Sequence, residues 1–347
     1  MSSELYCGVD LHSNNGVYHV MGADGKQVWH RRLPNRPETV VTALAPFRSD
    51  LVTVAIESTY NWYWLADCLE DAGYSVVLAN PSRMDQYRGM KNTDDDSDAT
   101  FIAELCRLRI LPTGWICPRE ERSLRDLLRR RMLTVQSRTR QINSLQSMLV
   151  RQSGSSSKYT VLETYTTEEL VDILKHESLL VVADAQLKLI RAHDDAIATL
   201  EQFALEKCRP RPEYRLLTSV PGIGKILAMT IMLEIGDIGR FASPGDFSSY
   251  VRAVKADRLS NGKVKGKNNS RNGNRYLAWA FIEAVNHAVR CCVPARKWYQ
   301  RKAAATLPVV ARKALASKFS KAVWYMLTQN RPFQIQKVFG HDFGRDG

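Results

Sequence analysis

The order of apolar segments in the first 115 residues constrains the fold more than any other feature of this sequence. Three strand-like runs come first, and an Asp-Gly pair at 24–25 between the second and third is typical of a hairpin turn. Helical and strand-like segments then alternate, which predicts a parallel portion with right-handed crossovers. The strand-like runs are 5–10, 16–21, 26–33, 51–56 and 75–79, and the helical segments are 37–47, 62–72 and 81–87. We therefore expect an α/β domain in which an antiparallel meander continues into parallel strands.

Acidic residues stand where these strands end. Asp10 closes the first strand, and Glu57 directly follows the buried strand 51–56. A third group, Lys91–Ala99 with the sequence KNTDDDSDA, precedes a helical segment and carries four aspartates within five residues. Because strand ends on one edge of a sheet converge, such acids can meet there and bind a divalent cation. The simpler alternative for the acidic run alone is a solvated cap of the following helix.

The register of the acidic run decides which of its carboxylates join the two strand-end acids. Asp95 and Asp98 are three residues apart, so they share a helical face if the run forms the first turn of the helix. Asp94 and Asp98, four residues apart, satisfy the same condition. We predict the pair Asp95 and Asp98. His12, two residues after the first strand-end acid, is either an outer contact of this site or, more simply, a surface histidine.

The composition favours a globular protein with a polyanionic partner. The chain has 347 residues, is 44% hydrophobic and carries a formal net charge of +13. An excess of positive charge of this size favours nucleic acid, because each neutralised phosphate releases counterions. The seven cysteines form no CxxC pair, and no apolar run is long enough to cross a bilayer. We expect reduced thiols in a cytoplasmic protein without a membrane segment.

The middle of the chain is predicted to be helical. Residues 118–151 form a long arginine-rich segment with an apolar seam, and 179–208 form a second long helix beyond a Ser/Gly-rich break. Two such helices predict an antiparallel stalk that offers a dimer contact. The arginines either face nucleic acid or form the solvated basic face of a packing helix. Our candidates for nucleic-acid contacts in this segment are Arg125, Arg129 and Arg130.

The most basic part of the chain is 251–275, which carries eight cations against one acid. Its Gly, Asn and Ser content predicts a loop that becomes ordered on a polyanion. Ser260 lies among these cations, where an alkoxide and a target phosphate are both favoured electrostatically, although a lone loop serine has usually no such role. The nucleic-acid-binding candidates here are Arg258, Lys263, Lys265, Lys267 and Arg271.

Three further segments flank this basic stretch. Pro221-Gly-Ile-Gly-Lys225, between two helical segments, is either a phosphate-binding hairpin or a plain helix–helix turn. Residues 296–321 add cations and no acid, with aromatic residues that either stack on bases or belong to the core. From about 334 the chain is expected to be flexible.

The order of strands and helices resembles the ribonuclease H-like arrangement of RuvC Holliday-junction resolvases. In that fold, acids lie at the end of the first strand, at the end of the fourth strand and at the start of a late helix. The matching positions here are Asp10, Glu57, Asp95 and Asp98. The resemblance implies that these carboxylates hold two Mg²⁺ ions, about 4 Å apart, that polarise a phosphodiester.

The whole chain resembles the Piv/MooV-type DEDD transposases, the recombinases of the insertion-sequence-110 family. The resemblance rests on the four acids, the helical middle, the P-G-I-G-K segment and a later S-x-G-K, K-G and S-x-x-G-N-x-x-L pattern. It implies that Ser260 attacks DNA to form a 5′-phosphoserine link, with Ser270 as the competing candidate. It also implies a structured guide RNA that pairs with donor and target DNA, and a tetramer of two dimers. The protein would associate with the bacterial nucleoid while it acts.

We expect four regions in the chain. They are a RuvC-like metal-binding domain at 1–115, a helical coiled-coil region at 116–210, a transposase domain with the catalytic serine at 211–333 and a flexible tail at 334–347. The leading hypothesis is a Mg²⁺-dependent serine recombinase. The alternatives are a RuvC-like junction endonuclease that uses water without a covalent intermediate, and a nucleic-acid-binding protein whose acids do not catalyse.

Overall fold

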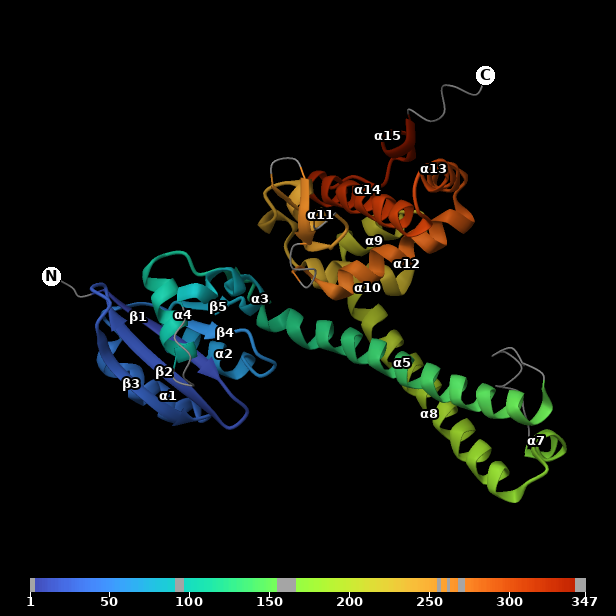
Figure 1. Cartoon of the computed structure of the whole chain (residues 1–347), viewed down its shortest axis with the longest axis horizontal. Coiled ribbons are helices and arrows are strands. Elements are labelled where there is room, and N and C mark those ends of the chain that lie inside the picture. The colour runs from blue at the N-terminus through green and yellow to red at the C-terminus, as the bar shows by residue number, and fades with distance from the viewer. Residues whose placement is uncertain are drawn as a thin grey trace. The chain divides into compact units, whose positions relative to one another are not determined.

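The computed structural model describes residues 4–90, 97–154, 167–254, 257–260, 263–267 and 272–340. The chain forms two compact units, 1–117 and 118–347, which we call unit 1 and unit 2 and describe separately (Figure 1). Unit 1 is a mixed sheet with helices, and unit 2 is mostly helical. The predicted fold class is therefore confirmed.

Unit 1 is built on a six-stranded sheet with the order β3-β2-β1-β4-β5-β6. The first three strands are antiparallel neighbours, whereas β4 pairs in parallel with both β1 and β5, as the sequence predicts. The short β6, which the sequence did not predict, pairs antiparallel with β5. The elements are β1 (Leu5–Leu11), β2 (Asn15–Gly22), β3 (Gln27–Pro34), α1 (Pro37–Leu44), β4 (Leu51–Glu57), α2 (Tyr63–Asp71), β5 (Val76–Ala79), α3 (Pro81–Met84), α4 (Ser97–Arg107) and β6 (Thr113–Gly114).

Helices cover both faces of this sheet. Because side chains alternate along a strand, Cys7 and Val9 of β1 pack with α1 and α2 on one face, whereas Tyr6 packs with α4 on the other. The contact between α4 and β1 depends on Gly8. A Cβ atom at this position would lie 2.1 Å from the carbonyl oxygen of Ala99 and 2.5 Å from the backbone nitrogen of Ala103. Only glycine allows the first turns of α4 to lie directly on β1.

Unit 2 begins with the predicted pair of long helices. Contacts between Arg131 and Glu201, and between Ser144 and Gln186, show that α5 and α8 run antiparallel, with α7 at the end of the pair (Figure 1). The helices are α5 (Arg119–Ser153), α7 (Thr167–Leu174), α8 (Glu177–Cys208), α9 (Pro212–Thr218), α10 (Lys225–Ile235), α11 (Pro244–Tyr250), α12 (Arg275–Cys291), α13 (Val293–Ala304), α14 (Pro308–Gln329) and α15 (Ile335–Phe339). The strands are β7 (Asp257–Ser260) and β8 (Lys263–Lys267).

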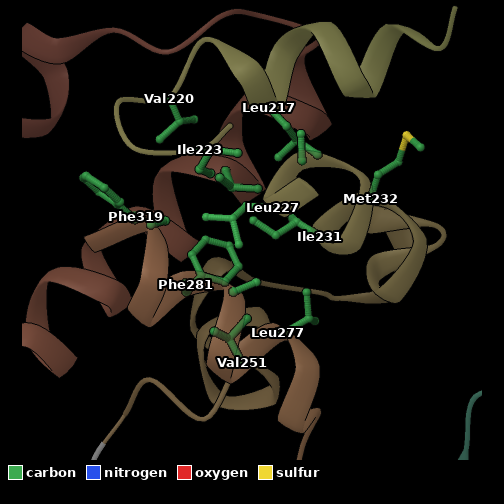
Figure 2. Packing of buried hydrophobic residues seen from close by; sticks show 14 of the residues in the cluster. Leu217, Val220, Ile223, Leu227, Ile231, Met232, Val251, Leu277, Phe281 and Phe319 are labelled. Carbon is green, nitrogen blue, oxygen red and sulfur yellow. The ribbon is translucent and has the colours of Figure 1, made fainter. Parts of the chain in front are cut away.

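The core of unit 2 surrounds α10, which is mostly apolar and buried from Leu227 to Ile235. Leu227 and Ile231 of this helix pack against Leu277 and Phe281 of α12, and Phe319 of α14 belongs to the same cluster (Figure 2). The P-G-I-G-K segment is the turn between α9 and α10, and its Gly222 has a φ of +86°. A Cβ atom at Gly222 would lie 2.2 Å from the carbonyl oxygen of Ala284. This close approach to α12 explains the glycine by packing alone.

Two segments of unit 2 differ from the prediction. The basic stretch expected to be a loop contains the antiparallel hairpin of β7 and β8. The tail expected to be flexible from 334 contains α15, whose Phe339 is buried and has its ring centroid 6.3 Å from that of Phe319. The apolar spacing of Ile335, Val338 and Phe339 holds this short helix against α13 and α14. Among the described residues, no helix has the length and apolar character needed to cross a membrane.

Candidate active site

Asp10 and Glu57 lie at the ends of neighbouring parallel strands. Val9 of β1 pairs with Ile56 of β4, so the next residue on each strand lies beside its counterpart. Since side chains alternate, these next residues point to the face opposite Val9 and Ile56. That face carries Ala55 and is covered by α4. The register therefore brings the two predicted strand-end acids to one place on the α4 face of the sheet.

Helix α4 places Asp98 on the same face of the sheet. The helix begins at Ser97, so Asp98 lies in its first turn, one residue before the carbonyl group that rests on Gly8. Phe101 and Ile102, three and four residues further along, are buried against the sheet. Asp98 shares their helical face and is half-buried. The fourth predicted acid, Asp95, and the alternative Asp94 lie outside the described residues.

The carboxylate of Asp10 is nearly inaccessible to solvent. The residue is 5% exposed, and its Oδ2 lies 3.2 Å from Nε2 of His12. The backbone carbonyl of His12 accepts hydrogen bonds from the side-chain amides of Asn35 and Asn61, at 3.0 and 2.9 Å. Because Asn61 follows β4, this contact ties the loop after β1 to the loop after β4. The sequence favoured a surface role for His12 as the simpler interpretation. In the structure, His12 is a direct neighbour of Asp10.

The donor groups at this edge suit a hard divalent cation. Carboxylate oxygens are the ligands that Mg²⁺ prefers, and a buried carboxylate such as that of Asp10 is costly unless a positive charge balances it. Among the described residues, however, no three His, Cys, Asp or Glu side chains form a group that could hold a metal ion, so Asp98 is not gathered with Asp10 and Glu57 into such a group. The oxygen donors of Asp10 and Glu57 fit the chemistry of a magnesium site, and Asp95, a further predicted ligand, lies outside the described residues.

The candidate nucleophile lies in unit 2, on the β7–β8 hairpin. Ser260 is the last residue of β7 and pairs with Lys263, the first residue of β8. Asn261-Gly262 stands between them in the sequence, a pair typical of two-residue hairpin turns. This signal, which we applied to the first domain, also predicts the hairpin seen here. The predicted nucleic-acid-binding residues Arg258, Lys263, Lys265 and Lys267 belong to the same hairpin, whereas Ser270 and Arg271 lie outside the described residues.

Both ends of the segment that carries Ser260 are held together. The backbone nitrogen of Asn274 donates to the carbonyl oxygen of Tyr250 at 2.7 Å. Nη2 of Arg252 donates to the carbonyl oxygen of Gly273 at 2.7 Å. Gly273 has a φ of +89°, and a Cβ atom there would lie 2.4 Å from the carbonyl oxygen of Tyr250, so this junction requires glycine. The serine-bearing segment thus leaves and re-enters the helical core at one point.

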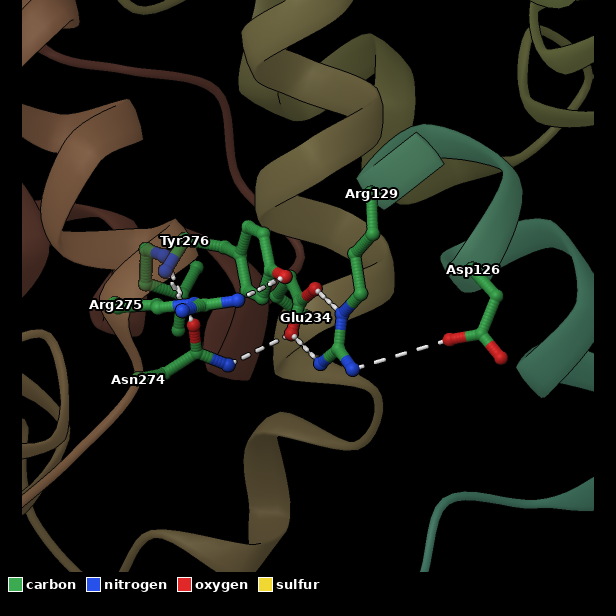
Figure 3. A network of polar contacts seen from close by, with 7 residues as sticks. Asp126, Arg129, Glu234, Asn274, Arg275 and Tyr276 are labelled. Atoms are coloured by element: carbon green, nitrogen blue, oxygen red, sulfur yellow. Dashed lines mark hydrogen bonds and ion pairs between the residues drawn. The ribbon is translucent and has the colours of Figure 1, made fainter. Parts of the chain in front are cut away.

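The three predicted arginines of α5 have different surroundings. Arg125 is 7% exposed, and Arg130 is exposed to solvent. Arg129 forms a two-pronged ion pair with Glu234 of α10, with N–O distances of 2.6 and 2.8 Å (Figure 3). Burial alone would lower the pKa of Arg129, but the hydrogen bonds and negative charge of Glu234 raise it above its usual value. Of these three residues, Arg130 is the one whose side chain is open to a phosphate.

The network around Glu234 extends to the start of α12. Nδ2 of Asn274 donates to the second oxygen of Glu234 at 2.7 Å, and Oδ1 of Asn274 accepts from the backbone nitrogens of Tyr276 and Leu277 (Figure 3). The guanidinium of Arg129 lies 4.6 Å from the centre of the Tyr276 ring. Asn274 therefore caps α12 and joins it to α10 and α5. Sequence reasoning missed Glu234, because its partner is 105 residues away.

Comparisons with known proteins match both units. A DEDD transposase model of IS110 elements, described as "Transposase", matches residues 7–152, and a model of the "Transposase IS116/IS110/IS902 family" matches residues 214–300. The transposase for insertion sequence element IS1111A of Coxiella burnetii is 24% identical over 345 residues, which cover 94% of this chain and 90% of that protein. The transposase for insertion sequence element IS1328 of Yersinia enterocolitica is 21% identical over 345 residues, 96% of this chain and 99% of that protein.

Proposed function

Because this chain belongs to the IS116/IS110/IS902 family of transposases, we propose that it cuts and rejoins DNA through a covalent bond to Ser260. The family implies DNA cleavage and strand transfer. The observation that supports the finer proposal is the adjacent position of Asp10 and Glu57 at the ends of β1 and β4, with Asp98 in the first turn of α4, the helix that covers the same face of the sheet. A separate hairpin in unit 2 carries the serine among cations.

The proposed reaction is a pair of transesterifications at phosphorus. The Ser260 oxygen attacks a phosphodiester and forms a 5′-phosphoserine bond, while the bond from phosphorus to the 3′ oxygen breaks and that oxygen leaves as a hydroxyl. In the second step a 3′ hydroxyl attacks the phosphoserine, which forms a new phosphodiester and releases the serine. The cations of the hairpin favour both the serine alkoxide and the phosphate.

The DEDD domain indicates dependence on a divalent metal, and we assign Mg²⁺ to Asp10, Glu57, Asp95 and Asp98. When bound, the metal would polarise the phosphodiester and stabilise its attacking and leaving oxygens. The contribution of the chain is to hold the carboxylates in place, with Gly8 letting α4 lie on β1 and His12 contacting Asp10.

Our proposal for the partners is donor DNA, target DNA and a guide RNA, with the protein as a dimer or tetramer. The net charge of +13 supports a polyanionic partner. The acids belong to unit 1 and Ser260 to unit 2, so one active centre can draw them from two protomers. The proposed location is the bacterial cytoplasm, at the nucleoid during the reaction.

Covalent trapping tests the proposal. The purified chain is incubated with DNA that carries both ends of its own insertion element, with the RNA that copurifies and with Mg²⁺, and the denatured products are analysed for protein–DNA adducts. We expect an adduct that is lost in Ser260→Ala, retained in Ser270→Ala, and lost when the metal is chelated or Asp10→Asn is introduced.

Three outcomes would contradict it. An adduct that disappears in Ser270→Ala alone would move the nucleophile to that residue. Cleavage without any adduct, still present in Ser260→Ala, would indicate a junction endonuclease that uses water. DNA binding that is unchanged in the combined variant Asp10→Asn and Glu57→Gln, with no strand breakage by the native chain, would indicate a binding protein.

A further inference from the structure

A basic cleft lies between α12 and α14, beside the point where the serine-bearing segment leaves the core. It has a volume of about 490 Å³. Residues 251–253, just after α11, form one wall, and the facing sides of α12 and α14 form the others. The charged groups that line it are Arg252, Arg290, Arg312 and Lys313, and Asn286 adds an amide. Its apolar lining includes Ile282 and Ala316.

The positive charge of this cleft has little counter-charge in the surrounding sequence. No acidic residue lines the cleft among the described residues, and residues 284–341, which include the second half of α12 from Ala284 and all of α13, α14 and α15, contain neither Asp nor Glu. Arg290 and Arg312 are exposed, so their guanidinium groups reach solvent. Burial and, to a smaller extent, the nearby Arg275 lower the pKa of Arg252.

The lining of the cleft matches one strand of nucleic acid. Cations at the rim suit the phosphates, and apolar side chains between them suit the sugars and base faces. The volume of the cleft lies in the range of small-molecule binding sites. The cleft is too small to enclose a duplex, so it suits a single strand.

The position of the cleft indicates which nucleic-acid strand it binds. Arg252 holds Gly273 across the base of the serine-bearing segment, so that segment leaves and returns at the rim of the cleft. Ser260 is seven residues beyond Ala253, and a fully extended chain of that length spans at most about 24 Å. A strand in the cleft is therefore within a few nucleotides of the serine.

We propose that the cleft between α12 and α14 binds the DNA strand whose phosphodiester Ser260 attacks, with Arg252, Arg290, Arg312 and Lys313 contacting its phosphates. This inference rests on the proposed function for the identity of the strand. Binding by the cleft itself is measured without any reaction at the serine. RNA is the competing occupant, and the experiment separates the two.

The first measurement is binding of a fluorescein-labelled, mixed-sequence single-stranded DNA to the full chain, with EDTA present to prevent cleavage. The test variant is Arg312→Gln with Lys313→Gln. The matched control is Arg301→Gln with Lys302→Gln on α13, which removes the same two charges from exposed positions outside the cleft. We expect roughly fivefold to tenfold weaker binding for the cleft variant and about the native affinity for the control. The slope of log affinity against log salt should become shallower by about 1.4, the value for two lost phosphate contacts on a single strand.

The second measurement locates the strand by crosslinking. A benzophenone amino acid replaces Val309, which lies at the cleft and is 65% exposed, or Val293 on α13, which is 55% exposed and outside the cleft. Single-stranded DNA and RNA of the same sequence are offered together. We expect DNA adducts from position 309 and few from position 293. Equal adducts from both positions, or a preference for RNA at 309, would overturn the inference.

The two proposals fail separately. If the cleft variant loses affinity and position 309 crosslinks DNA, but no Ser260 adduct is ever trapped, the cleft is a DNA site and the proposed reaction is wrong. If the serine adduct forms normally and the cleft variant binds DNA as tightly as the α13 control, the proposed function stands and the cleft inference is refuted.

Discussion

The ion pair between Arg129 and Glu234 provides the sharpest test of the packing in unit 2. The Glu234 side chain is 3% exposed and that of Arg129 is 29% exposed, so substitution of Arg129 by methionine leaves a buried carboxylate without its main counter-charge. Loss of one partner of a buried ion pair costs about 3–5 kcal/mol. Glu234 keeps the hydrogen bond from Asn274 at 2.7 Å, so we expect the lower end of this range, about 3 kcal/mol.

The double variant Arg129→Met with Glu234→Leu should be less damaging than Arg129→Met alone. Apolar side chains of similar volume remove both charges together, and such replacements are often neutral or stabilising. We expect this variant to lie within about 1 kcal/mol of the native chain. The matched control is Arg130→Met on the next residue of α5, which is exposed and should change stability by about 0.5 kcal/mol at most.

Hydrogen exchange followed by mass spectrometry measures the change in local stability in the full chain. A local measurement is necessary because the two units need not unfold together. Protection of peptides from α10 and from the start of α12 should fall about 100-fold in Arg129→Met, the equivalent of roughly 3 kcal/mol. A loss in Arg129→Met no larger than in Arg130→Met would refute the argument. A double variant as unstable as the two single changes added together would refute it equally.

Three further predictions concern unit 1 and the proposed active site. Gly8→Ala places a Cβ atom 2.1 Å from the α4 backbone and should destabilise unit 1 by about 3 kcal/mol in thermal unfolding, whereas Gly89→Ala, with nothing within 4 Å, should have little effect. Burial and, to a smaller extent, a neighbouring imidazole lower the pKa of His19, so the unfolded chain binds more protons below pH 6.5. Stability should therefore decline as the pH falls through that value, and His19→Gln should flatten this dependence in pH-dependent melting. Finally, mixing Ser260→Ala with Asp10→Asn chains should restore adduct formation if an active centre is shared between protomers, and no rescue at any ratio would indicate a self-contained site.

The sequence predicts most of unit 1 because its information there is local. Strand and helix periods, the hairpin pair at 24–25 and the placement of Asp10 and Glu57 at strand ends are all visible within a few residues. The role of Gly8 is different, since it depends on α4 lying directly on β1, about ninety residues apart in sequence. Periodicity predicts that a helix packs on a sheet, but it does not predict which residue must be small at the contact.

The hairpin that carries Ser260 could be predicted from its turn residues, but the composition of the segment indicated a loop instead. Eight cations with Gly, Asn and Ser indicate a loop, whereas Asn261-Gly262 indicates a tight turn between strands. The register of β7 and β8, with Ser260 opposite Lys263, follows the turn pair. Local turn chemistry outweighed average composition here, because a two-residue turn fixes strand pairing regardless of the charge on the strands.

The arginines of α5 show why a count of basic residues overstates the nucleic-acid surface of the stalk. Along this helix, Arg129 pairs with Glu234, Arg131 with Glu201 and Arg138 with Asp194, so much of its charge is balanced by acids on facing helices. These pairings are invisible in the sequence, where each arginine is as good a phosphate ligand as the next. The C-terminal helices differ, because residues 284–341 contain no acidic residue of their own. A local excess of positive charge attracts a polyanion, whereas paired charge mainly fixes helix packing. For this reason, the affinity of unit 2 for DNA should depend more on the cleft between α12 and α14 than on the arginine-rich stalk.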